Sequence, residues 1–366
     1  MIYTNTPILP ERAEELLALD TEDKEIISYT KIEEWFTAWD GKCYVSFSGG
    51  KDSTVLAYLA ANWLAHFRTP PWPLNLAFVN TGLEYPEIQR FVDEYTAWLR
   101  REFPRVTINL DRFRPKMNVR QVIERHGYPI ISKRVSGYIR SARNNPDSMR
   151  AKWIRGEEKT TFVSGGTWEF LILAPFKISD RCCDVMKKHP MNYYAAATGW
   201  KAITAEMATE SMQRREQWER TGCNAFQAQH LKGKPMSFWT EQDVLHFLLD
   251  RNIPFASVYG EIVASDGEND YSATLTPCAL HCTGCQRTGC IFCGFGAHLE
   301  KGENRFQRMR ITHPKHHAFC VGAENMIRRT GCGSQTKRDW AMRGCWITSA
   351  WPIRAKGEQN NEQDEN

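Results

Sequence analysis

The stretch Cys43-Tyr44-Val45-Ser46-Phe47-Ser48-Gly49-Gly50-Lys51-Asp52-Ser53-Thr54 decides the fold assignment of this chain. It predicts a short buried strand, a glycine turn and the start of a helix, because apolar residues between 55 and 64 recur at helical spacing. Such a turn directs backbone N–H groups and a helix N-terminus at one point, which suits a phosphate. Gly49 and Gly50 let the backbone approach that anion closely.

The polar side chains of the same loop also suit a phosphate. Lys51 adds a point charge, and the hydroxyls of Ser48 and Ser53 add donors. The Walker A pattern requires four residues between its first glycine and its Gly-Lys pair, and here there are none, so a Walker-type ATPase is excluded. An ordinary strand-to-helix turn with two glycines is the alternative, and the presence of both flanking elements argues against it.

Strands and helices alternate after this loop. We expect a second strand at Leu74–Asn80, a helix that continues to Arg101, and a third strand at Val106–Leu110. This alternation predicts an α/β fold with a doubly wound, mostly parallel sheet. Ligands of such sheets lie beyond the carboxyl ends of the strands, so the loops after Phe47 and Asn80 are expected to line one crevice.

The remainder of the chain predicts further elements. The apolar segment Thr160–Leu173 indicates a strand or hairpin, and Trp239–Arg251 indicates an amphipathic helix with Thr240 as its N-cap. We therefore expect four regions, which are an N-terminal helical segment (1–40), an α/β domain that carries the loop (41–235), a helical and cysteine-rich C-terminal module (236–350) and a disordered polar tail (351–366).

Composition indicates a soluble globular protein. The 366 residues are enough for a sizeable core, and no run of about 18 uncharged apolar residues predicts a membrane span. The N-terminus lacks the apolar region of a signal peptide. Nothing supports a secreted context for the 12 cysteines, so we expect a cytoplasmic protein without a disulfide framework.

Positive charge gathers in two segments although the net charge is only +4. The segment Arg112–Arg155 holds 12 Lys or Arg against two acidic residues, and Arg305–Arg343 holds nine against two. One interpretation is two solvated faces with a few phosphate contacts. The other is a surface that binds DNA or RNA, with aromatic residues such as Tyr138 and Trp153 available to stack on bases.

The cysteines are clustered. Cys182 and Cys183 are adjacent, and five more occur within sixteen residues, namely Cys278, Cys282, Cys285, Cys290 and Cys293. Cys-x-x-Cys spacing in an intracellular chain favours zinc or an iron–sulfur cluster, and spacing alone does not separate the two.

Seven segments of the chain follow one another in the order of the motifs of a known enzyme family. They are Ser48–Ser53, Val79–Glu87, Arg181–Pro190, Ala197–Trp200, Glu210–Arg214, Pro235–Pro254 and Thr288–Cys293. Through them the chain resembles the phosphoadenosine phosphosulfate (PAPS) reductase family of the PP-loop ATP pyrophosphatase superfamily. The resemblance runs in order from about residue 43 to about residue 320, and Asn80 stands where the family has Asp.

This resemblance implies an adenine nucleotide alpha hydrolase-like fold that binds ATP and Mg²⁺. Such enzymes cleave ATP between the α and β phosphates, release pyrophosphate and leave an adenylylated substrate. The implied nucleotide-binding residues are Ser48, Gly49, Gly50, Lys51, Asp52, Ser53, Asn80, Thr81, Gly82 and Glu84. The implied catalytic residues are Lys51 and Asp52 together with a cationic clamp of Arg181, Lys187 and Arg214.

The resemblance also implies one [4Fe–4S] cluster. By analogy with cluster-bearing members, its ligands are Cys182, Cys183, Cys290 and Cys293, and structural zinc is the alternative. Cys278, Cys282 and Cys285 are left without a role; they would bind a second metal, relay sulfur or be extra thiols.

Two departures from the family bear on the reaction. Sulfonucleotide reductases alter the loop and end in a Glu-Cys-Gly-(Leu/Ile)-His tail, whereas this chain keeps the complete Ser48–Ser53 loop and lacks that tail. We therefore expect ATP-dependent activation coupled to sulfur transfer from a sulfur donor, with DNA or RNA among the acceptors. The alternatives are a PAPS or adenylyl-sulfate reductase that releases sulfite with a thioredoxin-like reductant, and a non-catalytic nucleic-acid-binding regulator.

Overall fold

The computed structural model describes residues 3–68, 71–227, 231–265, 279–300 and 303–321. Its chain divides into two compact units whose sequences are interleaved. Unit 1 is formed by Met1–Asn118 and Val185–Ile291, and unit 2 by Val119–Asp184 and Phe292–Asn366. Cys278 and the tail predicted at 351–366 lie outside the described residues.

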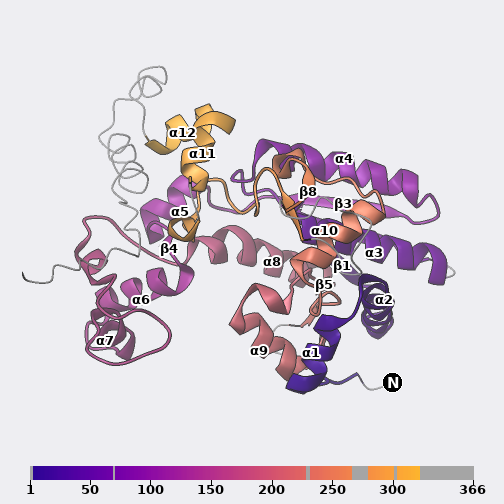
Figure 1. Ribbon diagram of the computed structural model, residues 1–366, viewed down its shortest axis with the longest axis horizontal. Coiled ribbons are helices and arrows are strands. Elements are labelled where there is room, and N and C mark those ends of the chain that lie inside the picture. Colours follow the sequence, from indigo (N-terminus) through magenta and orange to yellow (C-terminus); the bar gives the residue numbers. More distant parts are fainter. Residues whose placement is uncertain (1–2, 69–70, 228–230, 266–278, 301–302, 322–366) are drawn as a thin grey trace, which may run out of the picture. The chain divides into compact units, whose positions relative to one another are not determined.

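Unit 1 is built on a six-stranded sheet, which Figure 1 shows around β1 and β5. All neighbouring strands pair in parallel except the last two, which are antiparallel. The order of strands across the sheet is β3 (Ile108–Phe113), β2 (Leu74–Val79), β1 (Cys43–Ser46), β5 (Lys201–Ile203), β7 (Lys232–Gly233) and β6 (Asn224–Ala225). The mostly parallel α/β sheet expected from the sequence is confirmed.

The strand order reverses beside β1, since β2 and β3 follow on one side and β5, β7 and β6 on the other. This reversal is the topological switch point at which open α/β sheets bind ligands. The loop Ser48–Ser53 lies directly after β1, so the sheet topology places it at that point.

The helices of unit 1 begin where local signals predict. Asp20 and Thr240 accept hydrogen bonds from the backbone N–H groups three residues on, and Pro86 occupies the first turn of its helix. The helices are α1 (Pro10–Ala18), α2 (Thr21–Ala38), α3 (Lys51–Phe67), α4 (Pro86–Glu102), α8 (His189–Thr198), α9 (Met212–Thr221) and α10 (Glu241–Asp250). A π-helical turn at Asp184–Lys188 precedes α8, and all its residues but Asp184 belong to unit 1. A short antiparallel pair, β8 (Ile262–Ala264) and β9 (Leu280–Cys282), completes the unit.

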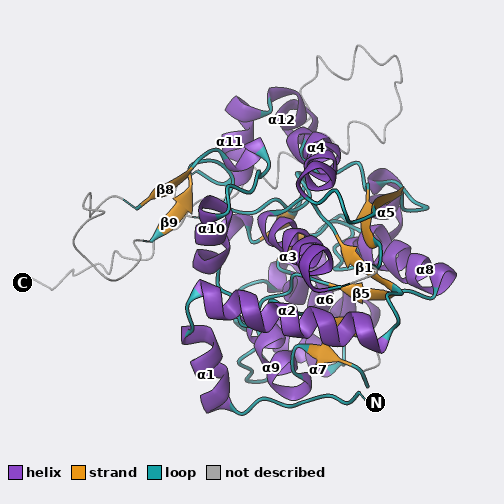
Figure 2. Ribbon diagram, turned by 90° about the vertical axis from the view of Figure 1, so that its right-hand side faces the viewer, coloured by secondary structure: helices purple, strands orange, loops and turns teal. Residues whose placement is uncertain are grey.

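The core of unit 1 lies around α3. Leu56, Leu59 and Leu64 are fully buried, and α3 packs against α2, α10 and the sheet. Figure 2 shows α2 and α3 side by side. This packing fixes the N-terminal turn of α3 relative to the strand ends, which holds the loop before it in place.

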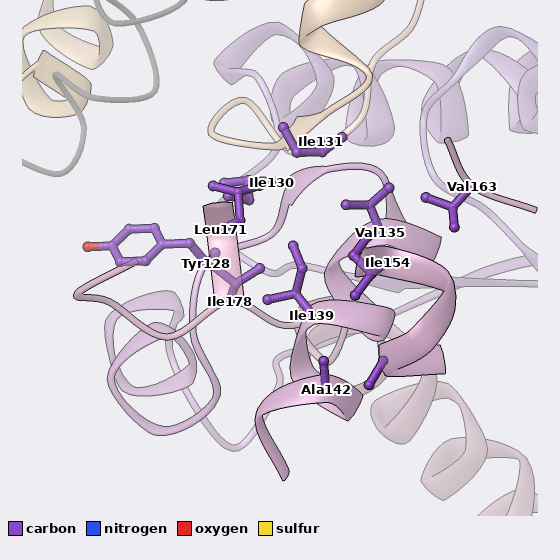
Figure 3. Close-up of a cluster of buried hydrophobic side chains, with 11 residues drawn as sticks. Tyr128, Ile130, Ile131, Val135, Ile139, Ala142, Ile154, Val163, Leu171 and Ile178 are labelled. Carbon is purple, nitrogen blue, oxygen red and sulfur yellow. The ribbon is translucent and has the colours of Figure 1, made fainter. Parts of the chain in front are cut away.

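Unit 2 is smaller and mostly helical. Its elements are α5 (Val119–His126), β4 (Ile130–Ile131), α6 (Lys133–Asn144), α7 (Met149–Arg155), β10 (Gly294–Phe295), α11 (Arg305–Thr312) and α12 (Pro314–Val321). Val135 and Ile139 of α6 pack with Ile154 of α7 in the cluster drawn in Figure 3. The parallel pairing of β4 with β10 joins the two sequence segments of this unit.

The prediction of a strand or hairpin at Thr160–Leu173 is wrong. This segment forms turns and then a 3-10 helix at Glu169–Leu173. The guanidinium of Arg143 donates hydrogen bonds to the carbonyls of Leu171, Ile172, Ala174 and Phe176, at 2.7–2.9 Å. These carbonyls are therefore satisfied by one side chain rather than by a strand partner.

Among the described residues, no helix combines the length and the apolar character that crossing a membrane requires.

Candidate functional site

The loop after β1 is shaped by its glycines and serines. Gly49 has φ +73°, and a Cβ atom there would come within 2.9 Å of Ile88 Cγ2, so both conformation and space require glycine. The Ser48 and Ser53 hydroxyls are 3.0 Å apart, and the backbone N–H of Ser48 donates to Ser53 Oγ at 3.2 Å. Hydrogen bonds across the loop thus hold its two ends together.

The N-terminus of α3 opens onto this loop. The first N–H groups of a helix have no acceptor within it. That of Lys51 donates to the Tyr259 hydroxyl at 3.3 Å, whereas within the described residues the N–H groups of Asp52 and Ser53 have no acceptor. The partial positive charge of the helix end therefore remains available to an anion.

Lys51 is the buried cation of the site. Only 5% of its side chain is exposed. Its Nζ lies 2.8 Å from Glu241 Oε1 of α10 and 3.6 Å from Cys282 Sγ of β9. A phosphate that binds Lys51 must therefore compete with the carboxylate of Glu241, which is half exposed at 49%.

Tyr259 and Thr288 cover the loop on another side. Their hydroxyl oxygens lie 2.5 Å apart, and the ring of Tyr259 lies 5.1 Å from Lys51 Nζ. A Cβ on Gly50 would lie 3.4 Å from the Tyr259 hydroxyl, so the glycine is in close contact with this cover. Burial raises the pKa of Tyr259 above its ordinary value, which keeps the hydroxyl protonated as a donor.

Asp52 carries the main electrostatic perturbation of the loop. Burial, followed by the negative charges of Glu210 and Glu241, raises the pKa of Asp52 from 3.8 to about 6, although Lys51 and Arg287 act against the shift. A carboxylate in this environment is stabilised by a cation, because the cation offsets the neighbouring negative charges. Strong pKa perturbation of this kind is typical of functional sites.

Cys282 is buried against the same lysine. Burial raises the pKa of its thiol, and the positive charge of Lys51 opposes that increase. Sequence reasoning left Cys282 without a role and did not find Glu241 or Tyr259, because none of the three is close to the loop in sequence.

The loop after β2 is the second part of the site. Because β1 and β2 pair in parallel, their carboxyl ends meet at one edge of the sheet. Glu84 accepts hydrogen bonds from the N–H and hydroxyl of Thr81 at 3.1 and 2.6 Å, and Asn80 Oδ1 accepts the N–H of Gly82 at 3.0 Å. Gln89 donates to both Asn80 and Glu84. Asn80 and Glu84 therefore shape this turn through local hydrogen bonds.

The cations expected to form a clamp are distributed over both units, and two of them pair with acidic residues. Arg214 is in unit 1 and pairs with Glu210. Lys187 lies in the π-helical turn of the same unit. Arg181 belongs to unit 2, where its Nη1 lies 3.5 Å from Asp184 Oδ2. Glu210 is therefore linked both to Arg214 and, through its charge, to Asp52.

The four cysteines expected to hold a cluster are divided between the units. Cys182, Cys183 and Cys293 belong to unit 2 and Cys290 to unit 1. Cys182 is buried and the others are half-buried. Four thiolates are a suitable donor set for a [4Fe–4S] cluster. However, the described residues contain no group of three or more His, Cys, Asp or Glu side chains arranged to hold a metal.

Comparison with protein families matches residues 42–134 and 157–295 to the phosphoadenosine phosphosulfate reductase domain. Comparison with curated proteins finds no match.

Similar solved structures include the phosphate complex of PAPS reductase from Candida auris, at 12% identity and TM-score 0.33, covering 69% of this chain and 92% of that one. A second is FMN adenylyltransferase from Candida glabrata, at 14% identity and TM-score 0.38, where the match covers 68% of this chain and 64% of that one. A third is the U34-tRNA thiolase NcsA from Methanococcus maripaludis with its [4Fe-4S] cluster, at 13% identity and TM-score 0.32, where the match covers 64% of this chain and 66% of that one. Values this low transfer no function.

Proposed function

The chain belongs to the phosphoadenosine phosphosulfate reductase domain family, and from this premise we propose that it binds ATP and cleaves it between the α and β phosphates. The observation that carries the proposal is the loop Ser48–Ser53 at the switch point of the sheet, where a helix N-terminus, the buried Lys51 and the perturbed Asp52 meet. A polyanion with a bound divalent cation suits this combination of charges.

Each loop residue has a role that follows from its position. Gly49 and Gly50 allow phosphate oxygens to approach the backbone, and the N–H groups of Asp52 and Ser53 donate to them. Lys51 exchanges the carboxylate of Glu241 for a phosphate oxygen. These contacts stabilise the charge that develops on the pyrophosphate leaving group.

Mg²⁺ fits the acidic side of the loop. The carboxylate of Asp52 lies in the field of Glu210 and Glu241, and hard oxygen ligands are those that Mg²⁺ prefers. The ion characteristically takes one or two carboxylates and completes its coordination with phosphates and water. One carboxylate is therefore enough for Mg²⁺, which agrees with the finding that the described residues hold no group of three or more His, Cys, Asp or Glu side chains placed to bind a metal. Asp52 is the ligand we propose, and Mg²⁺ would neutralise charge on the phosphates.

The adenylylated acceptor then undergoes sulfur chemistry, in our proposal. The unaltered loop supports ATP rather than a preformed adenylyl sulfate as the substrate. Cys182, Cys183, Cys290 and Cys293 are the proposed ligands of a [4Fe–4S] cluster. Such a cluster would supply a site for sulfur binding or electron transfer, and Arg181, Lys187 and Arg214 are the proposed cationic contacts of the transferred group.

Pyrophosphate release tests this proposal. The Lys51→Ala variant is expected to lose ATP-dependent pyrophosphate release while keeping the melting temperature of the parent within a few degrees. Lys42→Ala is the matched control, because Lys42 is exposed and precedes β1, at the opposite end of the strand from the loop. Equal pyrophosphate release from parent and Lys51→Ala protein would refute the assignment of the loop.

The same assay separates the two other functions. Sulfite release from an adenylyl sulfate, with no pyrophosphate from ATP, would identify a reductase. Nucleotide binding without any product would identify a regulator that retains the fold.

A further inference from the structure

A continuous row of cationic and aromatic side chains crosses α6, α7 and the segment that follows in unit 2. We name it the cation–aromatic strip, and its residues in order are Arg150, Tyr138, Trp153, Phe162 and Arg134. The two arginines lie over the rings at its ends, 5.8 Å from the centroid of Tyr138 and 5.3 Å from that of Phe162. The three rings contact one another in succession with centroids 5.7 Å apart.

The ends of the strip are open to solvent. Arg134 and Arg150 are exposed, and 52% of Phe162 is exposed. Among the described residues neither arginine forms an ion pair, and Arg134 Nη1 donates a hydrogen bond to the backbone carbonyl of Phe162 at 3.2 Å. Tyr138 and Trp153 are half-buried against the core of unit 2, which gives the strip a fixed base. The exposed ring of Phe162 and the two exposed guanidinium groups leave both aromatic and cationic surface open to a partner.

Other arginines of the same basic segment are already engaged by the fold. Arg143 donates to four backbone carbonyls, Arg140 pairs with Asp180 at 3.0 Å, and Arg155 is bonded to Glu157. Arg120 pairs with Glu124 at 2.8 Å. Part of the positive charge of Arg112–Arg155 is therefore taken up by the fold, whereas Arg134 and Arg150 stay exposed beside aromatic rings.

Most of the strip lies outside the part of the chain shared with its family. Residues 135–156 fall between the two stretches matched to the family domain, and they contain Tyr138, Arg150 and Trp153. Conversely, the nucleotide loop lies within the first matched stretch. The strip is thus a feature of this chain that the common nucleotide chemistry of the family does not account for.

We propose that the cation–aromatic strip binds single-stranded nucleic acid. Bases stack on aromatic rings in a sequence-tolerant manner, and guanidinium groups bind the phosphates between them. Paired bases of a duplex cannot reach the rings, so the strip favours single strands. The use of this strand as the acceptor rests on the proposed function, whereas the binding itself does not and is measured without ATP.

Fluorescence anisotropy with a labelled single-stranded DNA of about 15 nucleotides tests the proposal on the full chain. Phe162→Ala is expected to weaken binding about tenfold, which corresponds to the loss of one stacked base. Arg134→Ala combined with Arg150→Ala is expected to weaken binding and to reduce the slope of log K against log salt by about 1.4, at about 0.7 per phosphate contact.

The control is Arg120→Ala combined with Arg125→Ala on α5, which removes the same charge from exposed residues of the same unit. It is expected to retain parental binding at moderate salt. Equal losses in both double variants, or parental affinity in Phe162→Ala, would overturn the proposal. Competition by polyglutamate as effective as by unlabelled DNA would also overturn it, since that result would identify a general polyanion surface. Failure of the parent protein to bind the labelled DNA at low salt would likewise overturn the proposal.

Discussion

Replacing Asp52 with Asn is expected to stabilise the folded protein at neutral pH, although Asp52 lies at the centre of the proposed site. The pKa of Asp52 rises from 3.8 to about 6 on folding, chiefly through burial. Between these values the native state binds more protons than the unfolded state, so stability decreases as pH rises through this range. A shift of about 2 units corresponds to a penalty of up to about 3 kcal/mol above pH 6.

Urea unfolding of parent and Asp52→Asn at about pH 4 and about pH 7.5 measures this penalty. The two proteins are expected to agree within about 1 kcal/mol in acid, where the native Asp52 is protonated. At neutral pH the variant is expected to be more stable by about 1–3 kcal/mol, because the amide removes the buried charge but keeps the shape. Asp250→Asn, at the exposed end of α10, is the control and should change stability little at either pH.

The Asp52→Asn variant should also lose Mg²⁺-dependent pyrophosphate release. Gain of stability with loss of function is the expected signature of a residue retained for its chemistry. A variant that is less stable than the parent at neutral pH would refute the reasoning, since it would show that Asp52 stabilises the fold as a partner of Lys51.

Three other variants test separate parts of the structure. Glu241→Gln should bind a non-hydrolysable ATP analogue about three- to tenfold more tightly by calorimetry, because the phosphate no longer competes with a half-exposed carboxylate for Lys51; weaker binding would contradict this. Cys182→Ser and Cys293→Ser should each lose iron and acid-labile sulfide after anaerobic purification, whereas stoichiometric zinc without sulfide in the parent would reject the cluster. Arg143→Ala should destabilise unit 2 by about 3 kcal/mol and accelerate its proteolysis, because four carbonyls lose their donor; unchanged proteolysis would argue against that role.

The sequence predicted the elements whose signals are local. The strand at β1, the glycine turn and the start of α3 follow from residues that are neighbours in the chain, and the cap at Thr240 is a signal four residues long. The strand prediction for Thr160–Leu173 is wrong because Val163 and Leu171 are buried from turns and a 3-10 helix, and the carbonyls of Leu171 and Ile172 accept hydrogen bonds from Arg143. Apolar composition does not distinguish a strand from turns whose carbonyls are satisfied by a side chain, and here it does not imply burial either, since Phe170 and Leu173 are exposed.

The partners of the loop were beyond sequence reasoning for a different reason. Glu241 and Cys282 are separated from Lys51 by 190 and 231 residues, and no periodic pattern links positions so distant. Charge counts have the same weakness. The 12 basic residues of Arg112–Arg155 are equivalent in sequence, yet the guanidinium of Arg143 donates to four backbone carbonyls, whereas Arg134 donates to one carbonyl and remains exposed beside Phe162.

One of these distant partners, Glu241, gives Lys51 of the loop Ser48–Ser53 a counterion from within the protein. With no phosphate bound, Glu241 neutralises the buried Lys51 and at the same time raises the pKa of Asp52 through repulsion. In the proposed function, an incoming nucleotide takes over Lys51, and a cation at Asp52 offsets the remaining negative charge. Phosphate and cation should then bind more tightly together than separately. The phosphate displaces Glu241 from Lys51 and adds negative charge near Asp52, and the cation neutralises that charge. Titrating Mg²⁺ in the presence and absence of the ATP analogue measures this coupling, and Glu241→Gln should reduce it by removing the carboxylate that links Lys51 to Asp52.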